Sequence, residues 1–255
     1  WRVLKRKISR IRSTKEIMDR SELILNKDGS VYHLKLKSEN LSSTVILVGD
    51  PFRVDKITKH FDKIEFKTQN REFKSVTGSY KSKRITVVST GIGGGLILDG
   101  KVFPGETGNS CYIGHHSINF DGRQCACGRK GCVEAYSSGP QMVAIAHENG
   151  WAPGINSFID LAQSAREGNE IAIDAISQGT RALSVGIVNF VGTLDINHVV
   201  IGGGVAQAGE IFWGPLQKHI ETESKAIGFL KNIQLRKAEL ERDAGILGAA
   251  LAVLS

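Results

Sequence analysis

The sequence predicts an α/β protein built from two unlike parts. In the first part, continuous apolar runs and period-2 alternation indicate several strands around one short helix. In the second part, segments with helical periodicity alternate with short β-branched runs, which is typical of an α/β architecture. The chain has 255 residues and is therefore long enough for one large domain or two small ones.

The composition excludes two classes of protein. With 41% hydrophobic residues, the chain is ordinary for a globular protein and unlike a disordered one. No apolar run approaches the ~20 residues that cross a bilayer, so we expect no membrane span. The formal net charge is +7, but residues 1–20 alone carry eight Lys and Arg against two acidic residues. We therefore expect a solvated, disordered leader at 1–20 and no specific nucleic-acid partner.

The start of the chain and its cysteines together indicate a compartment. The basic N-terminal stretch is followed by no apolar core, unlike a secretory signal. Without such a signal, the four cysteines point to a reducing environment, so a cytoplasmic protein is expected.

The first part reads as a strand-rich segment. The run "STVILVGD" at 43–50 predicts a buried strand that stops at a Gly-Asp-Pro turn, and "RVDKITKHF" after it has helical spacing. Residues 64–90 alternate with period 2, which predicts a meander of strands with Gly78 and Lys81–Lys83 as turn residues.

The second part begins with "GGLILDGKVF", a predicted hairpin around Asp99-Gly100, and continues with a loop-rich, cysteine-bearing segment to Cys132. The remaining elements are expected from their periodicity and from glycine boundaries. They are helices around 133–150, 157–168 and 170–195, a buried strand running into a glycine turn at 198–209, a helix at 210–224, a strand at 233–240 and a closing apolar helix at 244–254.

The sharpest chemical signal is "IGHHSINFDGRQCACGRKGCVEAY". Its pattern C-x-C-x4-C is made by Cys125, Cys127 and Cys132. Zinc prefers four tetrahedral nitrogen and sulfur ligands, and three cysteines with one histidine form a common structural set. The loop is polar, which disfavours the alternatives of buried reduced cysteines or a disulfide. On spacing alone either His115 or His116 could be the fourth ligand, and Cys111 is expected to be a small core residue.

From Thr90 to the C-terminus the chain resembles the ROK family of sugar kinases and repressors. The matching strings are "TGIGGGLILDGKVF", "GHHSINFDGRQCACGRKGCVEAY" and "HVVIGGGVAQAG". The resemblance implies an actin-like ATPase fold, related to ribonuclease H, and a glucokinase-like transfer of phosphate from ATP with Mg²⁺ to a hexose. It also implies that structural zinc is bound by His115, Cys125, Cys127 and Cys132. The sugar contacts that it implies are His115 and Glu134. The nucleotide contacts that it implies are Gly91, Gly93, Gly94, Gly95, Gly202, Gly203 and Gly204.

Several parts of the ROK pattern are missing. Tyr112 stands where the family has a glutamate that binds sugar hydroxyls. The N-terminal Asp-x-Gly-Gly-Thr phosphate loop is absent, and so is the Asn-Asp pair whose aspartate acts as general base. Between Phe61 and Thr90 the only aspartate is Asp62, with no asparagine before it. We therefore assign no catalytic residue and expect the kinase to be catalytically impaired.

From about residue 21 to Gly93 the chain resembles the start of the nucleoside phosphorylases, closest to the uridine phosphorylase type. The strings are "VYHLKLKSENL", "VILVGDPFRVDKITKHF", "NREF" and "ITVVSTGIG". The resemblance implies that Gly49 and Arg53 bind inorganic phosphate and that Arg71 reaches the phosphate of a neighbouring subunit. A backbone amide and a guanidinium at a strand end suit an oxyanion.

Both families carry a "TGIG" string, and the chain changes from one family to the other at this string. We interpret it as a chimera, either a gene fusion or two sequences joined there by an assembly error. The expected organisation is a leader at 1–20, a phosphorylase-like fragment at 21–93 and a ROK-like domain at 94–255.

The leading functional prediction is an impaired ROK-type hexose kinase with a structural zinc loop. Its expected partners are a sugar and a nucleotide, with a second copy of the chain in a homodimer as a further possibility. The alternatives are a uridine phosphorylase-like, phosphate-binding protein and a non-enzymatic sugar-binding ROK module. A ROK repressor would normally begin with a helix-turn-helix, and residues 1–90 read instead as strands and one short helix.

Overall fold

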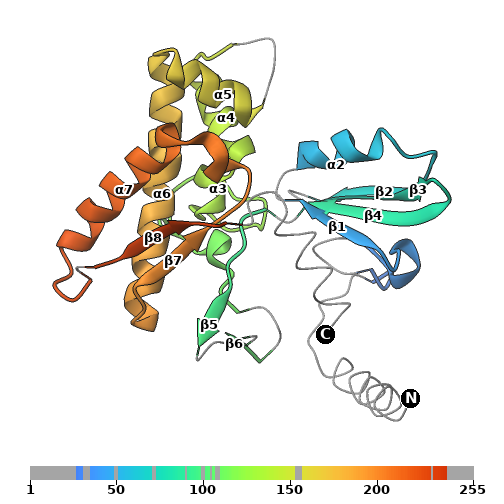
Figure 1. The fold of residues 1–255 in the computed structure, drawn as a ribbon, viewed down its shortest axis with the longest axis horizontal. Helices are drawn as coiled ribbons and strands as arrows, with labels where there is room; N and C mark the ends of the chain where they lie inside the picture. The colour runs from blue at the N-terminus through green and yellow to red at the C-terminus, as the bar shows by residue number, and fades with distance from the viewer. Residues whose placement is uncertain are drawn as a thin grey trace.

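The elements of the chain fall into two lobes, one dominated by a sheet and one by helices (Figure 1). The sheet lobe holds the blue and teal elements of the N-terminal part, and the helical lobe holds the green to red elements of the rest of the chain. The computed structural model describes residues 27–30, 35–48, 51–70, 73–89, 91–98, 101–103, 105–106, 110–152, 157–230 and 232–239.

The sheet lobe is a four-stranded sheet in the order β1-β4-β3-β2, with one helix on one face (Figure 1). Strands β1 and β4 are parallel, and the pairs β2–β3 and β3–β4 are antiparallel. The side chains of Val54, Val76 and Val87 form a small buried core between the helix and the sheet. The elements are η1 (Ser38–Asn40), β1 (Val45–Val48), α2 (Pro51–Thr58), β2 (Lys63–Asn70), β3 (Phe73–Tyr80) and β4 (Lys83–Ser89).

The expected strand, helix and meander are therefore present. The prediction that Gly78 is a turn residue is wrong. This glycine lies inside β3, and the turn is made by Lys81 and Ser82, both with positive φ. A Cβ at position 78 would lie 2.3 Å from the carbonyl oxygen of Lys63, next to the register irregularity before Phe66. The glycine thus permits a close approach at a bulge within the sheet.

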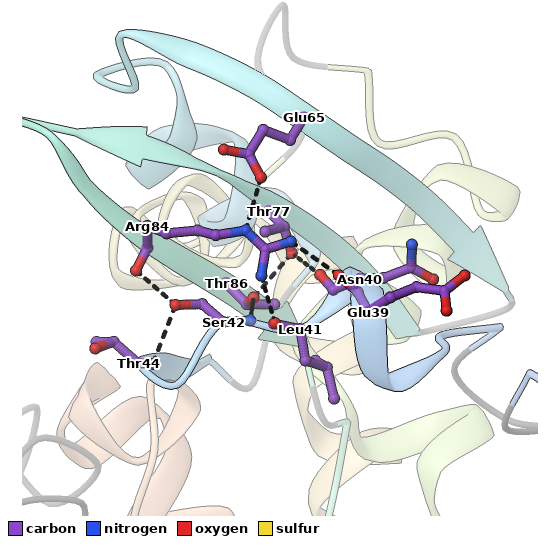
Figure 2. Close-up of polar contacts among 9 residues, drawn as sticks. All are labelled: Glu39, Asn40, Leu41, Ser42, Thr44, Glu65, Thr77, Arg84 and Thr86. Carbon is purple, nitrogen blue, oxygen red and sulfur yellow. Dashed lines mark hydrogen bonds and ion pairs between the residues drawn. The ribbon is translucent and has the colours of Figure 1, made fainter.

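Hydrogen bonds tie the segment before β1 to the sheet (Figure 2). The amide of Ser42 donates to Thr86 Oγ1 at 2.8 Å, and both side chains are buried. Thr77 Oγ1 donates to the carbonyl of Asn40 at 2.7 Å and lies 2.8 Å from Thr86 Oγ1. The guanidinium of Arg84 bonds Glu65 at 2.7 Å and the main-chain carbonyls of Leu41 and Glu39 at 2.5 and 3.0 Å. These bonds satisfy backbone groups of an irregular segment.

A short hairpin leads away from the sheet lobe. As predicted, its two strands are antiparallel, and they form a sheet of their own: β5 (Leu96–Leu98) and β6 (Lys101–Phe103). The expected turn at Asp99-Gly100 lies outside the described residues.

The helical lobe is built around α6, a helix of 25 residues. Asn169 caps its start by accepting from the amide of Ala172, and it ends at Asp195 in the left-handed region. Its buried face, including Ile176, packs in one large apolar core with Met142, Leu161 and Leu216 from the other helices. The helices are α3 (Glu134–Ser137), α4 (Gly139–Glu148), α5 (Phe158–Arg166), α6 (Glu170–Leu194) and α7 (Glu210–Lys225).

The last described sheet is the parallel pair β7 (His198–Ile201) and β8 (Gln234–Lys237). The sequence predicts β7 as a buried strand, and this is wrong, because the side chain of Val200 is 65% exposed. Within the described residues β7 pairs with β8 alone. The expected leader at 1–20 and closing helix at 244–254 lie outside the described residues.

In the described part of the chain, none of the helices combines the length and apolar character required to cross a membrane.

Candidate functional site

Four side chains gather in the loop that precedes α3. One donor atom from each of His115, Cys125, Cys127 and Cys132 lies within 4.8 Å of all the others. The Nδ1 atom of His115 is 3.6 Å from the Sγ of Cys125, and the Sγ atoms of Cys127 and Cys132 are also 3.6 Å apart. The cysteines are all free thiols. This donor set suits a tetrahedral ion that prefers nitrogen and sulfur.

The backbone folds tightly around this cluster. The amide of Cys125 donates to the carbonyl of Arg129 at 2.8 Å, and the amide of Gly131 donates to the carbonyl of Arg123 at 2.7 Å. Gly131 has φ +66°, and a Cβ there would lie only 1.6 Å from the carbonyl oxygen of Asn119. The loop therefore needs glycine at this position to bring its cysteines together.

Burial disfavours the thiolate form of the three cysteines in this cluster. It raises the pKa of Cys132 to about 11, assisted by the neighbouring Cys127, and it also raises the pKa of Cys125. Burial also opposes ionisation of Cys127, but a backbone hydrogen bond with Arg129 and its two thiol neighbours leave its pKa below the ordinary value. A bound metal ion would reverse this balance by stabilising the thiolates.

The structure distinguishes the two adjacent histidines. His115 belongs to the four-residue cluster, whereas the ring of His116 lies 5.1 Å from that of Phe190. The ring of Tyr112 lies 4.7 Å from that of His115, so the residue in the position of the family's glutamate packs beside a donor of the cluster. Cys111, which we expected in the core, is only partly buried and has φ +60°.

A cavity of 790 Å³ lies close to this loop. The two glycine-rich turns form part of its wall, and other parts come from β7, from the starts of α4 and α5, from the apolar face of α6, and from residues of α2 and α7. The glycines in its wall are Gly91, Gly93, Gly94, Gly95, Gly202, Gly203 and Gly204. Its apolar wall includes Leu183, Ile187, Phe190, Val191 and Phe212.

The glycines of these turns serve different purposes. A Cβ on Gly91 would lie 2.4 Å from the carboxylate of Glu134, and one on Gly94 would lie 2.5 Å from the carbonyl of Cys111. Gly93 and Gly203, in contrast, have no atom within 4 Å of the position of a Cβ, so their backbone borders open space. The first pair allows tight packing, and the second pair leaves room for a ligand to approach the main chain.

Glu134 connects the cysteine loop to the first glycine turn of the cavity. Its side chain is 5% exposed, and its Oε2 accepts a hydrogen bond from the amide of Ile92 at 2.9 Å. The carboxylate thus fixes the first glycine turn to the helix that comes after the cysteine loop.

Comparison with known proteins identifies both parts of the chain. The family model described as "ROK family" matches residues 76–255. The chain belongs to the ROK family. The model described as "Phosphorylase superfamily" matches residues 43–102, so the chain is a two-part protein, as predicted.

The relatives of the ROK part include kinases and a regulator. The chain is 34% identical over 183 residues to the N-acetylmannosamine kinase of Escherichia coli O7:K1, which is 72% of this chain and 60% of that protein. A ROK glucokinase from Streptomyces griseus, in complex with glucose and AMPPNP, aligns with TM-score 0.58 and 28% identity over 64% of this chain and 57% of its own. A ROK transcriptional regulator, a homologue of the E. coli MLC protein, aligns with TM-score 0.54 and 28% identity over 62% of this chain and 42% of its own. The chain thus spans about three fifths of the kinases that it matches.

The residues predicted from the ROK resemblance do not all lie at the cavity. The predicted glycines meet at the cavity, whereas His115 and Glu134, the predicted sugar contacts, are not among the described residues that line it. Of the phosphorylase-type residues, Gly49 and Arg71 lie outside the described residues. Arg53 lies in α2, and its side chain is not described. Sequence reasoning did not identify the apolar wall, because its residues come from distant helices that only the tertiary fold brings together.

Proposed function

We propose that the ROK part holds one zinc ion and binds a hexose and ATP, with phosphoryl transfer very slow or absent. The observation that carries this proposal is the four-donor cluster beside a cavity bordered by two glycine turns, in a chain of the ROK family.

Zinc is the metal that this donor set favours. Three thiols and one imidazole make a closed tetrahedral set that is typical of structural zinc, whereas magnesium and calcium prefer oxygen ligands. Cys125 and Cys132 are 4% and 0% exposed, which suits an ion that stabilises a loop. Bound there, zinc would hold His115 and the segment leading to Glu134 in fixed positions.

The relatives support the assignment of sugar and nucleotide. One is named for N-acetylmannosamine, and the glucokinase structure contains glucose and an ATP analogue. The cavity combines an apolar wall with main-chain amides at the open glycines, which fits the base and the phosphates of a nucleotide. Magnesium bound together with the nucleotide would neutralise part of the phosphate charge.

The impairment is inferred from missing chemistry. The chain lacks the family's Asn-Asp pair and its first phosphate loop, and Tyr112 replaces a carboxylate. A general base contributes about 10²–10⁴-fold to rate, so its loss alone raises the barrier by about 3–5 kcal/mol. Phosphoryl transfer depends on positioning and charge stabilisation, so each further loss reduces the rate again.

A coupled ADP-release assay tests this proposal on the full chain, with glucose, mannose, N-acetylmannosamine and N-acetylglucosamine as substrates. We expect calorimetry to detect weak sugar binding and the assay to detect no turnover above the rate without sugar. Turnover on the order of 1 s⁻¹ or faster with any of them would contradict the impairment. Absence of zinc by elemental analysis of reduced protein would contradict the metal assignment.

The regulator among the structural relatives supports a second candidate, a sugar-binding module without catalysis. Both candidates bind sugar, so nucleotide binding separates them. Calorimetric binding of a non-hydrolysable ATP analogue supports the kinase-like site, and sugar binding without nucleotide binding supports the module.

A further inference from the structure

The sheet lobe and the first glycine turn meet at one edge of the sheet. Strands β1 and β4 are parallel neighbours, and their last residues, Val48 and Ser89, are partners in register. Helix α2 comes after the end of β1, and the glycine turn comes after the end of β4. The segments that leave two parallel strands emerge at the same edge, which is where ligands bind in open α/β sheets. Helix α2 is therefore placed to reach the cavity beside that turn.

Lys56 of α2 lines this cavity, together with both glycine turns. It is a contribution from the phosphorylase-like segment to a site otherwise formed by the ROK part. Its neighbour Asp55 pairs with Lys67 at 3.9 Å and with Lys74, so those two lysines have a carboxylate partner. Among the residues that the structure describes, Lys56 has no carboxylate within ion-pair distance and is exposed.

The cavity wall offers little other charge. In the described part of the wall, Lys56 and Asp160 are the residues with a full charge at neutral pH. Asp160 already accepts hydrogen bonds from the amide and hydroxyl of Ser157 as part of a capping box. The cavity therefore presents one cation with no carboxylate partner, two glycine turns with open space at Gly93 and Gly203, and an apolar wall.

We infer that Lys56 binds the phosphate end of the ligand in this cavity. The inference rests on the proposed nucleotide site and adds to it a residue from the other part of the chain. An ammonium group is a point charge with three hydrogen-bond donors, which suits the oxygens of a phosphate. The main-chain amides of the glycine turns could donate to the other phosphate oxygens. The inference assigns the phosphorylase-like segment a role in a site formed mainly by the ROK part.

Calorimetry on the full chain tests this assignment with four probes: ADP, a non-hydrolysable ATP analogue, adenosine and inorganic phosphate. The variant Lys56→Met removes the charge and keeps much of the apolar stem, and Lys56→Arg keeps the charge. The matched control is Lys59→Met, an exposed lysine three residues further on that does not line the cavity.

We expect Lys56→Met to weaken binding of ADP and the ATP analogue by about 3- to 10-fold, the range for one partly exposed charged contact. Adenosine affinity should stay unchanged, Lys56→Arg should restore most of the loss, and Lys59→Met should remain within about twofold of wild type. This pattern supports the inference.

The other outcomes separate the two proposals. Equal ADP affinity in Lys56→Met and wild type overturns the inference and leaves the nucleotide site standing. A third outcome is that wild type binds inorganic phosphate but no nucleotide, and that Lys56→Met no longer binds phosphate. This outcome supports the lysine contact and overturns the nucleotide proposal. Failure of wild type to bind any of the four probes overturns both.

Discussion

The two lobes are stabilised in different ways. The sheet lobe has a small apolar core centred on Val54, Val76 and Val87, and a hydrogen-bond network on residues before β1 (Figure 2). The helical lobe has a large continuous core around α6 that includes fully buried Leu161 and Leu216. Because apolar burial is the main favourable term in folding, the helical lobe is expected to be the more stable part. The comparison indicates that the stability of the sheet lobe depends more on polar contacts than the stability of the helical lobe does.

The largest expected effect concerns the cluster of His115, Cys125, Cys127 and Cys132, which among the described residues only the helical lobe contains. We expect Cys132→Ser to abolish stoichiometric zinc and to lower the Tm by about 5 °C or more, since losing a structural metal costs several kcal/mol. Cys111→Ser, outside the cluster, is the matched control and should keep its zinc. Elemental analysis and thermal denaturation measure both, and full zinc occupancy in Cys132→Ser would refute the ligand assignment.

The next prediction compares the two cores directly. Leu216 and Val87 are both 0% exposed, in the helical and the sheet lobe respectively. We expect Leu216→Ala to cost about 2–5 kcal/mol, and Val87→Ala about 2 kcal/mol for the smaller volume removed. Hydrogen exchange combined with mass spectrometry shows in which lobe each substitution lowers the stability. Loss of protection in both lobes from either substitution would show a single cooperative unit and would contradict the comparison.

A smaller effect is expected from the network before β1. Arg84→Lys keeps the charge but cannot bond Glu65 and the carbonyls of Leu41 and Glu39 together, as the guanidinium does. Because Arg84 is substantially exposed, we expect a loss of about 1 kcal/mol or less, confined to the sheet lobe. Faster hydrogen exchange at residues 38–44 with unchanged zinc content is the expected result, and slower exchange there would be contrary to it.

The smallest effect concerns pH. Burial, and after it the nearby Arg181, holds the pKa of His219 below its ordinary value of 6.5. The folded state therefore favours the neutral imidazole, so this contribution to stability is present above pH 6.5 and is lost as the pH falls below it. In His219→Gln, chemical denaturation should show a slightly flatter dependence of stability on pH across this window. A steeper dependence of stability on pH in this variant would contradict the lowered pKa of His219.

The elements that local patterns specify could be predicted from the sequence. Helices α5 and α6 have apolar periodicity with Ser157 and Asn169 as N-caps, and the hairpin at β5 and β6 has its own turn signal. The cysteine spacing likewise predicted that Cys125, Cys127 and Cys132 lie together, because the three come from a single short loop.

Features that depend on long-range pairing could not be predicted. Spacing alone did not choose between His115 and His116, and the apolar letters of β7 gave no sign that Val200 would be exposed. Nothing local in α2 shows that Lys56 lines a cavity formed by distant segments. The two family models overlap at 76–102, and the structure places β4 from this overlap in the sheet lobe. The boundary at 93/94 therefore stays a prediction, as do a homodimer and a cytoplasmic location.

The conformation of Gly131 has a consequence for the coding sequence. Its positive φ and the 1.6 Å approach of the Asn119 carbonyl leave no space for a Cβ. Third-base changes in a glycine codon are silent, whereas a change at either of the first two bases replaces the residue. In a saturation library selected for zinc retention, this codon should therefore vary at its third base alone. Neighbouring codons for exposed side chains such as Lys130 should vary at all three positions.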